Sequence, residues 1–178
     1  MPQTGKEENT IQFNYIIGDQ LINVKYRDGR KNFKLYKGAE KVFYNINSII
    51  GYKDCVITEG EMDVLALHEA GITNAISVPN GATLHHNNLD YLDNCIDYFD
   101  DKERIILAVD TDEPGLALKQ ELVRRLGAEV CFLVDFKECK DANEYLIKYG
   151  KEKLKQTITK ARPYPLENVT TFKDIESD

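Results

Sequence analysis

The sequence has no long apolar run. None of its apolar stretches approaches the roughly 20 residues that a membrane-spanning helix needs, so no membrane segment is expected. Residues 1–9 are polar and lack the apolar segment of a secretory signal. We therefore predict a cytoplasmic protein that has no membrane partner, with a disordered N-terminus over residues 1–10.

Paired cysteines are lacking as well. The four cysteines, Cys55, Cys95, Cys131 and Cys139, are far apart and form no CxxC pair. Neither zinc ligation nor disulfides are therefore expected in a reducing compartment, and we interpret these residues as buried, apolar thiols. The sequence also has no Walker loop, no GxSxG elbow and no recognisable Ser/His/Asp set.

An excess of positive charge is missing from the chain as a whole. The formal net charge of −7 argues against an affinity for nucleic acid along the entire sequence. Residues 21–53 are the exception, with eight basic residues against two acidic ones, a local net charge of +6. A basic segment beside an acidic remainder suits a polyanion held by cations on one side and by metal on the other.

The N-terminal part of the sequence has a β pattern. Three segments that alternate apolar and polar residues are separated by short turn signals, which predicts a small antiparallel sheet. We assign this sheet to a basic, β-rich subdomain over residues 11–50. The three predicted strands are residues 11–17, 21–27 and 32–36.

The third of these strands carries a basic residue and an aromatic residue on one face. Lys34 and Tyr36 are two positions apart, so both side chains point to the same side of the strand. One interpretation is a solvated face over a half-buried sheet. The other is a strip that contacts phosphates or nucleic acid, with the aromatic ring stacking on bases.

From residue 52 onward, short apolar strands alternate with helical patterns. At 178 residues the chain is long enough for one full core, and the alternation predicts the α/β class. We expect a parallel four-stranded sheet flanked by helices over residues 51–150, followed by a C-terminal helix and linker over residues 151–178. The predicted strands are 54–58, 75–78, 104–109 and 129–134, and the predicted helices are 61–70, 87–99, 114–126, 142–149 and 151–161.

Two acidic clusters directly follow two of the predicted strands. Glu59 follows the first strand of the parallel sheet, and Asp110 and Asp112 follow the third. Open α/β sheets bind ligands at the carboxyl ends of their strands, so these three carboxylates are expected to converge there. Carboxylates in such proximity repel one another unless a cation lies among them. Asp110 and Asp112 suit a hard cation such as Mg²⁺, and we predict a divalent metal at this edge.

Two of the acidic residues also have a structural explanation. Asp112 could cap a helix that begins near Pro114, although capping leaves Asp110 unexplained. Asp141 stands three residues before Glu144, a spacing that resembles a capping box. Asp141 could therefore cap its helix, lie beside the metal, or do both.

Other residues near the predicted strand ends are candidates for weaker roles. Asp63 is four residues after Glu59 and could face the same side, whereas we assign Glu61 only to the favourable end of the helix dipole. Gly60 would allow the backbone to approach a phosphate or a neighbouring strand. Asn80 and Gly81 form a tight loop at the same edge, which is also a generic turn signal.

Four motifs together resemble the Toprim domain. This domain is shared by bacterial-type primases, topoisomerases of types IA and II, recombination-repair proteins and some nucleases. The Glu-Gly-x-x-Asp and Lys-Asp-x-x-Glu elements are most similar to those of primases, in particular the phage and mitochondrial primase-helicases of the Twinkle type. The four motifs are residues 58–63, 78–82, 110–115 and 140–144.

The resemblance implies a primase core that synthesises RNA primers on single-stranded DNA from nucleoside triphosphates by nucleotidyl transfer. Its implied cofactor is Mg²⁺ or Mn²⁺. The implied catalytic residues are Glu59, Asp63, Asp110 and Asp112, and the implied metal ligands are Glu59, Asp110, Asp112 and Asp141. The implied nucleotide- or DNA-binding residues are Lys34, Lys37, Gly60, Asn80 and Gly81.

The sequence also departs from the primase pattern. Asn143 stands where many primases have a further aspartate, which removes one weaker metal position. No zinc-binding module and no helicase motif are present, and residues 162–170 resemble the start of a linker. We therefore expect a fragment of a longer protein that has a replicative helicase as domain or partner. The alternatives are a Toprim nuclease or topoisomerase-like phosphodiester enzyme, and a non-catalytic DNA-binding module of a replicative helicase.

Overall fold

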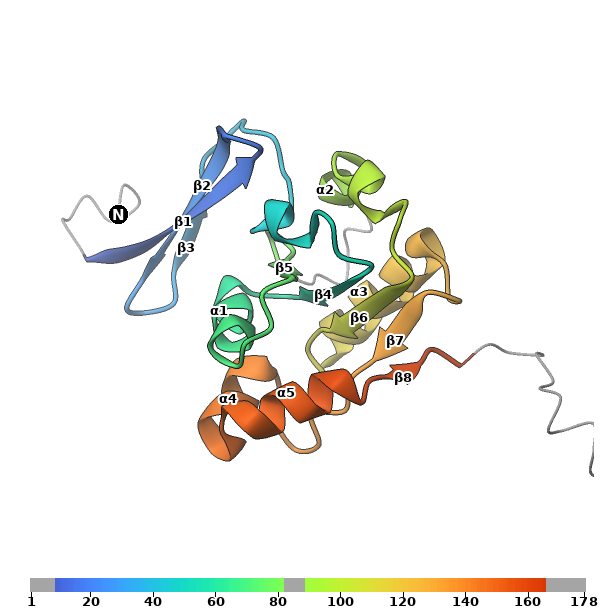
Figure 1. Ribbon diagram of the computed structural model, residues 1–178. Coiled ribbons are helices and arrows are strands. Elements are labelled where there is room, and N and C mark those ends of the chain that lie inside the picture. Colours follow the sequence, from blue (N-terminus) through green and yellow to red (C-terminus); the bar gives the residue numbers. More distant parts are fainter. Residues whose placement is uncertain (1–8, 82–88, 166–178) are drawn as a thin grey trace, which may run out of the picture.

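The computed structural model describes residues 9–81 and 89–165, and its first element is a small antiparallel sheet (Figure 1). The sheet has the order β1-β2-β3, and both strand pairs are antiparallel. This confirms the small antiparallel sheet that the sequence predicted. The strands are β1 (Thr10–Ile17), β2 (Gln20–Asp28) and β3 (Phe33–Leu35).

The second sheet contains the four predicted parallel strands and one further strand. Its order is β5-β4-β6-β7-β8, in which β5, β4, β6 and β7 are parallel and β8 is antiparallel to β7. The strand β8 has only two residues and lies within the segment that we predicted as a linker. Its Pro163 stands at a sheet edge, where proline is tolerated. The strands are β4 (Asp54–Thr58), β5 (Ala75–Ser77), β6 (Arg104–Ala108), β7 (Cys131–Leu133) and β8 (Arg162–Pro163).

Helices cover both faces of this second sheet, as its two-sided apolar strands require. Val56 and Ile106 pack with residues of α1, α4 and α5, whereas Ile57 and Leu107 pack with residues of α2, α3 and β1. Successive residues of one strand thus enter opposite cores. The helices are α1 (Glu61–Glu69), α2 (Asp90–Asp93), α3 (Glu113–Leu126), α4 (Ala142–Tyr149) and α5 (Lys151–Thr159), with 3-10 turns η1 (Ile46–Ile49) and η2 (Ile96–Phe99).

The predicted helix over residues 87–99 is not continuous. Residues 87 and 88 lie outside the described residues, and the remainder forms the short helix α2 and the turn η2. Asp and Asn side chains compete with a helix for backbone hydrogen bonds and contacts elsewhere. Here Asn94 donates to the carbonyl of Lys41 at 2.8 Å, and Asp93 pairs with Arg125. Tertiary contacts therefore outweigh the helical pattern.

The small sheet docks on the second sheet through an aromatic contact. Phe13 and Tyr15 of β1 are buried, and their rings meet Tyr44 edge-on at centroid distances of 5.7 and 5.5 Å. Tyr44 in turn exchanges backbone hydrogen bonds with Ser77 of β5. The small sheet is thereby fixed beside the carboxyl end of β5.

Other sequence predictions concern the cysteines, membrane-spanning segments and the ends of the chain. The four cysteines are free and buried, as predicted. Within the described ranges, no helix is long and apolar enough to cross a membrane. Residues 1–8 of the predicted disordered segment 1–10, and residues 166–178 of the predicted C-terminal helix and linker, lie outside the described residues. Thr10 already belongs to β1, so the predicted disordered segment extends too far. The domain boundaries at residues 10, 50 and 150 stay predictions.

Candidate metal centre

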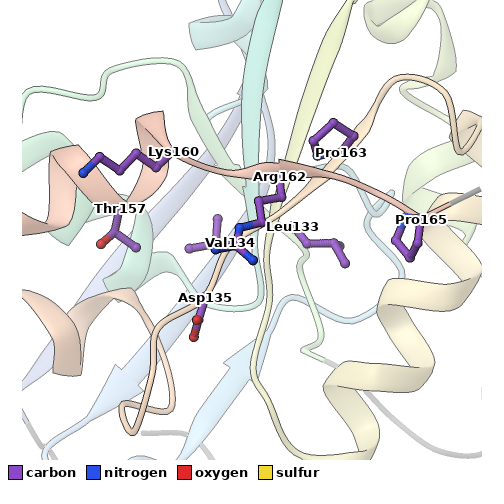
Figure 2. A pocket seen from close by; sticks show the side chains of 8 residues that line it. All are labelled: Leu133, Val134, Asp135, Thr157, Lys160, Arg162, Pro163 and Pro165. Atoms are coloured by element: carbon purple, nitrogen blue, oxygen red, sulfur yellow. The ribbon is translucent and has the colours of Figure 1, made fainter. Parts of the chain in front are cut away.

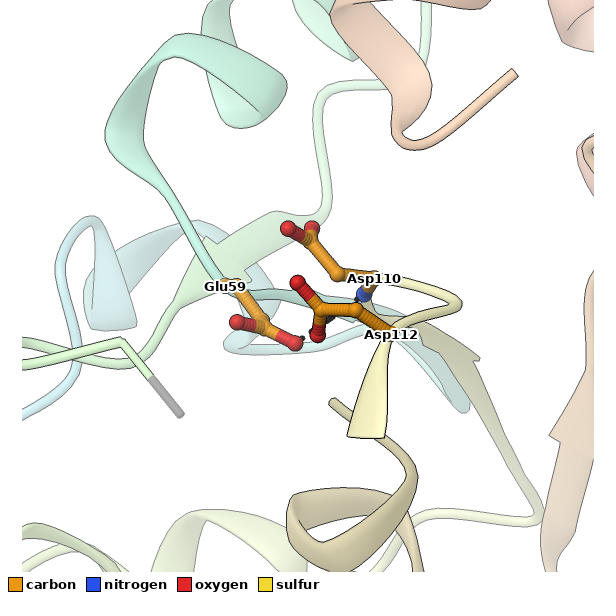
Figure 3. A group of neighbouring side chains, drawn as sticks. All are labelled: Glu59, Asp110 and Asp112. Atoms are coloured by element: carbon orange, nitrogen blue, oxygen red, sulfur yellow. Dashed lines mark hydrogen bonds between the residues drawn. The ribbon is translucent and has the colours of Figure 1, made fainter. Parts of the chain in front are cut away.

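The centre of the site is formed where two neighbouring strands end. β4 and β6 pair in parallel with Thr58 opposite Ala108, so Glu59 and Asp110 emerge side by side at the same edge. The backbone N–H of Asp110 donates to Oε1 of Glu59 at 3.0 Å. This hydrogen bond orients the Glu59 carboxylate toward the loop that follows β6 (Figure 3).

Five carboxylates converge at this edge in two overlapping groups. Oxygens of Glu59, Asp110 and Asp112 lie within 4.8 Å of one another (Figure 3). The same holds for oxygens of Asp63, Asp110 and Asp141. Asp110 belongs to both groups. We call these five residues the carboxylate cluster. The structure therefore brings together every acidic residue that the sequence singled out for metal binding or catalysis, while their roles stay predictions.

Two members of the carboxylate cluster also cap helices. Oδ1 of Asp112 accepts a hydrogen bond from the N–H of Gly115 at 3.0 Å, and Oδ1 of Asp141 accepts one from Glu144 at 2.7 Å. Each carboxylate has a second oxygen that the cap does not use. Capping is therefore confirmed for both residues and is compatible with membership of the carboxylate cluster, while their role in metal binding stays a prediction.

Gly115 provides the closest backbone approach in the site. A Cβ atom at this position would lie 2.2 Å from the carbonyl oxygen of Asp110 and 2.6 Å from Oε1 of Glu59. Such distances are far below van der Waals contact, so only glycine fits. The absence of a side chain at Gly115 therefore allows the first turn of α3 to lie directly against the Glu59 carboxylate and the Asp110 backbone.

Burial and mutual repulsion raise the pKa of two cluster residues. Asp63 is 7% exposed and accepts a hydrogen bond from the N–H of Asn143 at 3.0 Å. Burial, and next the charge of Asp141, raise the pKa of Asp63 to about 7. Burial also raises the pKa of Asp110, although Lys140 acts in the opposite direction. A divalent cation among these groups would favour their ionised forms, so the donor set fits Mg²⁺ or Mn²⁺.

The raised pKa of Asp63 predicts a pH-dependent response to metal. Its folded-state pKa of about 7 exceeds the value of about 3.9 in an unfolded chain. Without metal, stability should therefore fall as pH rises from about 4 to about 7. Bound Mg²⁺ should remove this loss, so we expect Mg²⁺ to raise the melting temperature more at pH 8 than at pH 5.5, measured by scanning fluorimetry.

A variant isolates the contribution of that one carboxyl group. Asp63→Asn should raise the metal-free melting temperature at pH 8 by roughly 5 °C, because a neutral amide carries no desolvated charge. Asp135→Asn is the control, since exposed Asp135 also accepts a backbone hydrogen bond, from Lys137 at 2.8 Å. If Mg²⁺ raised the melting temperature of the wild-type chain equally at pH 5.5 and at pH 8, the result would contradict the predicted pH dependence.

Lys140 is a site residue to which the sequence analysis assigned no role. Its Nζ lies 2.9 Å from Oδ2 of Asp110 and 3.4 Å from Oδ2 of Asp112. The hydrogen bond to Asp110 raises the pKa of Lys140 above its usual range. The signal was available, because Lys140 precedes Asp141 in one of the four motifs, but its contact with Asp110 depends on how two strand-end loops meet.

Glu61 corrects one of the sequence interpretations. We assigned it only to the helix dipole, but it is 3% exposed and accepts hydrogen bonds from the Tyr15 hydroxyl and from Nζ of Lys25, the latter at 2.8 Å. Lys25 also donates to the carbonyl of Pro79 at 2.9 Å. This buried network, Tyr15–Glu61–Lys25–Pro79, ties the small sheet to α1 and to the loop after β5.

None of the five predicted nucleotide- or DNA-binding residues belongs to the carboxylate cluster. Lys34 is paired with Tyr26 of β2 and so lies on the opposite face from Lys25. Lys37 and Asn80 are exposed. Gly60 is the N-cap residue of α1, and Gly81 has a positive φ of 67°. The binding roles of these five residues, Lys34, Lys37, Gly60, Asn80 and Gly81, stay predictions.

A separate pocket lies beside β8, the outermost strand of the second sheet. Its volume is about 330 Å³, and it is formed where β7, β8 and the end of α5 meet (Figure 2). Asp135, Lys160 and Arg162 supply its charged side chains. No member of the carboxylate cluster lines it among the described residues, so the pocket is not part of the candidate metal centre.

The fold and the site together define an α/β protein with a carboxylate centre at the carboxyl ends of adjacent parallel strands. Residues 56–146 match a family model described as Toprim-like. The chain belongs to this family, and the predicted resemblance is confirmed. The matched range includes all five members of the carboxylate cluster.

The relatives connect the chain to primases. It is 38% identical to the primase homolog protein of Arabidopsis thaliana over 91% of this chain and 53% of the relative. It is 36% identical to the Twinkle homolog protein of the same plant, described as chloroplastic/mitochondrial, over 95% of this chain and 26% of the relative. The chain thus spans about half or less of these curated relatives. The primase fragment of the bacteriophage T7 primase-helicase superposes with a TM-score of 0.71 at 28% identity, covering 83% of this chain and 61% of that structure.

Proposed function

We propose that this chain is the catalytic core of a DNA primase, which synthesises RNA primers on single-stranded DNA by metal-dependent nucleotidyl transfer. The observation that carries the proposal is the convergence of five carboxylates in two groups that share Asp110. The names of the relatives support primer synthesis as the reaction. The described residues place the cluster at the sheet edge where α/β proteins bind their ligands.

The donor set suits Mg²⁺ or Mn²⁺ held by Glu59, Asp110 and Asp112, with Asp63 and Asp141 as assisting carboxylates. When bound, such an ion neutralises phosphate charge and orients the reacting phosphate. The residues of this chain hold the ligands in place beforehand. The N–H of Asp110 positions Glu59, and the N–H of Gly115 positions Asp112.

The proposed partners of the chain are a nucleoside triphosphate and a single-stranded DNA template. Lys34, Lys37 and Gly60 are proposed to contact the triphosphate or the template, together with Asn80 and Gly81 in the loop that follows β5. That loop lies beside the carboxyl end of β4, since β5 and β4 are neighbours. We further propose a replicative helicase as a linked domain or partner, and a cytoplasmic location.

The first test replaces two of the proposed ligands. Asp110→Asn/Asp112→Asn should abolish saturable Mg²⁺ binding, measured by calorimetry, and should lower primer synthesis on single-stranded DNA by at least roughly 100-fold. Both substitutions of this double variant keep the side-chain volume, so a general loss of the fold is not expected. Asp97→Asn/Asp100→Asn is the matched control, because both residues are exposed and lie in or beside η2.

The same experiment separates the alternatives. Metal binding that the double substitution leaves intact would remove the cluster from the mechanism. Metal-dependent cleavage of labelled DNA without primer synthesis would favour a Toprim nuclease or topoisomerase-like enzyme. Metal binding with neither activity would favour a non-catalytic DNA-binding module.

A further inference from the structure

The ammonium group of Lys140 contacts two of the carboxylates that are proposed to hold a metal ion. It contacts Oδ2 of Asp110 at 2.9 Å and Oδ2 of Asp112 at 3.4 Å. Asp110 is shared by both groups of converging oxygens. The ammonium therefore bridges Asp110 and Asp112. A divalent ion bound to the same two carboxylates would compete with it.

The Lys140 residue has a fixed backbone and a side chain with room to move. Its N–H donates to Oε2 of Glu144 at 2.7 Å, and the next residue, Asp141, caps α4. Its side chain is 54% exposed, in contrast to the buried Lys25. A lysine stem has four flexible carbons, so the ammonium can leave the carboxylates while its base stays in place.

Electrostatics favours such a movement when metal binds. In the metal-free protein, the ammonium offsets part of the repulsion among carboxylates that lie within 4.8 Å of one another. A divalent ion supplies twice that charge and repels the ammonium. The phosphate oxygens of a bound triphosphate would offer the ammonium new acceptors, and lysine is a common phosphate ligand.

We propose that Lys140 is the internal counter-ion of the metal-free cluster, that a divalent ion displaces it, and that the displaced ammonium binds the triphosphate of the incoming nucleotide. Its second half rests on the proposed primase function. Lys140 thereby acts as a substrate-binding residue that couples metal binding to nucleotide binding. The coupling requires no movement of the backbone, since only the side chain changes partners.

The test uses Lys140→Met in the full chain, with two readouts that do not depend on catalysis. Mg²⁺ titration by calorimetry without nucleotide should show binding about tenfold tighter than in wild type, because the competing charge is gone. The affinity for a fluorescent ATP analogue, measured by anisotropy at saturating Mg²⁺, should fall about tenfold. Lys140→Arg should restore part of the nucleotide affinity, since it keeps the positive charge.

Lys148→Met is the matched control. Lys148 is 48% exposed and pairs with Glu138 at 2.8 Å, so its exposure and ion-pair distance resemble those of Lys140. Its partner Glu138 is outside the carboxylate cluster. We expect both affinities of Lys148→Met to equal those of wild type. A melting temperature within a few degrees of wild type would show that both variants are folded.

Each outcome decides one half of the proposal. Unchanged Mg²⁺ affinity in Lys140→Met would overturn displacement by the metal. Tighter Mg²⁺ binding with unchanged nucleotide affinity would overturn the triphosphate contact. A wild-type chain that binds Mg²⁺ but not the ATP analogue would overturn the proposed function together with the triphosphate contact, whereas displacement is decided by the Mg²⁺ titration alone.

Discussion

Gly115→Ala should lower the free energy of unfolding by about 3 kcal/mol and weaken Mg²⁺ binding by at least about tenfold. The added Cβ would meet the carbonyl oxygen of Asp110 at 2.2 Å and Oε1 of Glu59 at 2.6 Å. The nearer clash is with backbone, so rotation of a side chain cannot relieve it. The start of α3 must move away from β6, and the cap between Asp112 and the N–H of Gly115 moves with it.

Chemical denaturation would measure the stability of this variant, and calorimetry its metal affinity. Gly29→Ala is the control, because a Cβ there would have no heavy atom within 4 Å. It should leave both quantities near wild type. If Gly115→Ala bound Mg²⁺ as tightly as Gly29→Ala, the close approach at α3 would have no part in shaping the metal centre.

Local pattern was sufficient to predict the strands and the position of the carboxylate cluster. The apolar runs before Glu59 and Asp110 become β4 and β6, because short β-branched segments bounded by turns suit buried parallel strands. Strand polarity then determines that both residues emerge at one edge. That edge was predictable without knowing the order of the strands, since all carboxyl ends of a parallel sheet lie together.

Contacts between distant segments could not be predicted in the same way. The pairing of Lys25 with Glu61 joins residues 36 positions apart, and it exists only because the small sheet docks beside α1. The contact of Lys140 with Asp110 likewise depends on two loops after different strands. The edge strand β8 is too short for any periodicity, so its pairing with β7 is also a tertiary property.

The carboxyl group has two oxygens, so a helix cap does not exclude a residue from the carboxylate cluster. Asp112 and Asp141 each matched a helix-capping pattern that also explained them without metal. In the structure one oxygen of each caps its helix, and each residue still belongs to a group of converging oxygens. The cap then serves the site, because it fixes the carboxylate at the positive end of a helix dipole.

Glu61→Ala should lower the free energy of unfolding by about 3–5 kcal/mol, because it leaves the buried ammonium of Lys25 without its carboxylate partner. The Tyr15 hydroxyl loses its acceptor in the same substitution. Glu69→Ala is the control on the same helix, since Glu69 is exposed and its loss should change stability by less than about 0.5 kcal/mol. Urea denaturation would compare the two variants.

A double-mutant cycle tests whether the Lys25–Glu61 pair carries that loss. Lys25→Met/Glu61→Ala should be less destabilised than the sum of its two single variants, because neither buried charge is then left alone. Hydrogen exchange should show the loss of protection in β1 and β2 of Glu61→Ala, since the network anchors the small sheet. Additive effects in the cycle would mean that burial of apolar residues such as Phe13 holds the sheet instead. Because Lys25 also donates to the carbonyl of Pro79, the same variants should loosen the loop that carries Asn80 and Gly81 beside the metal centre.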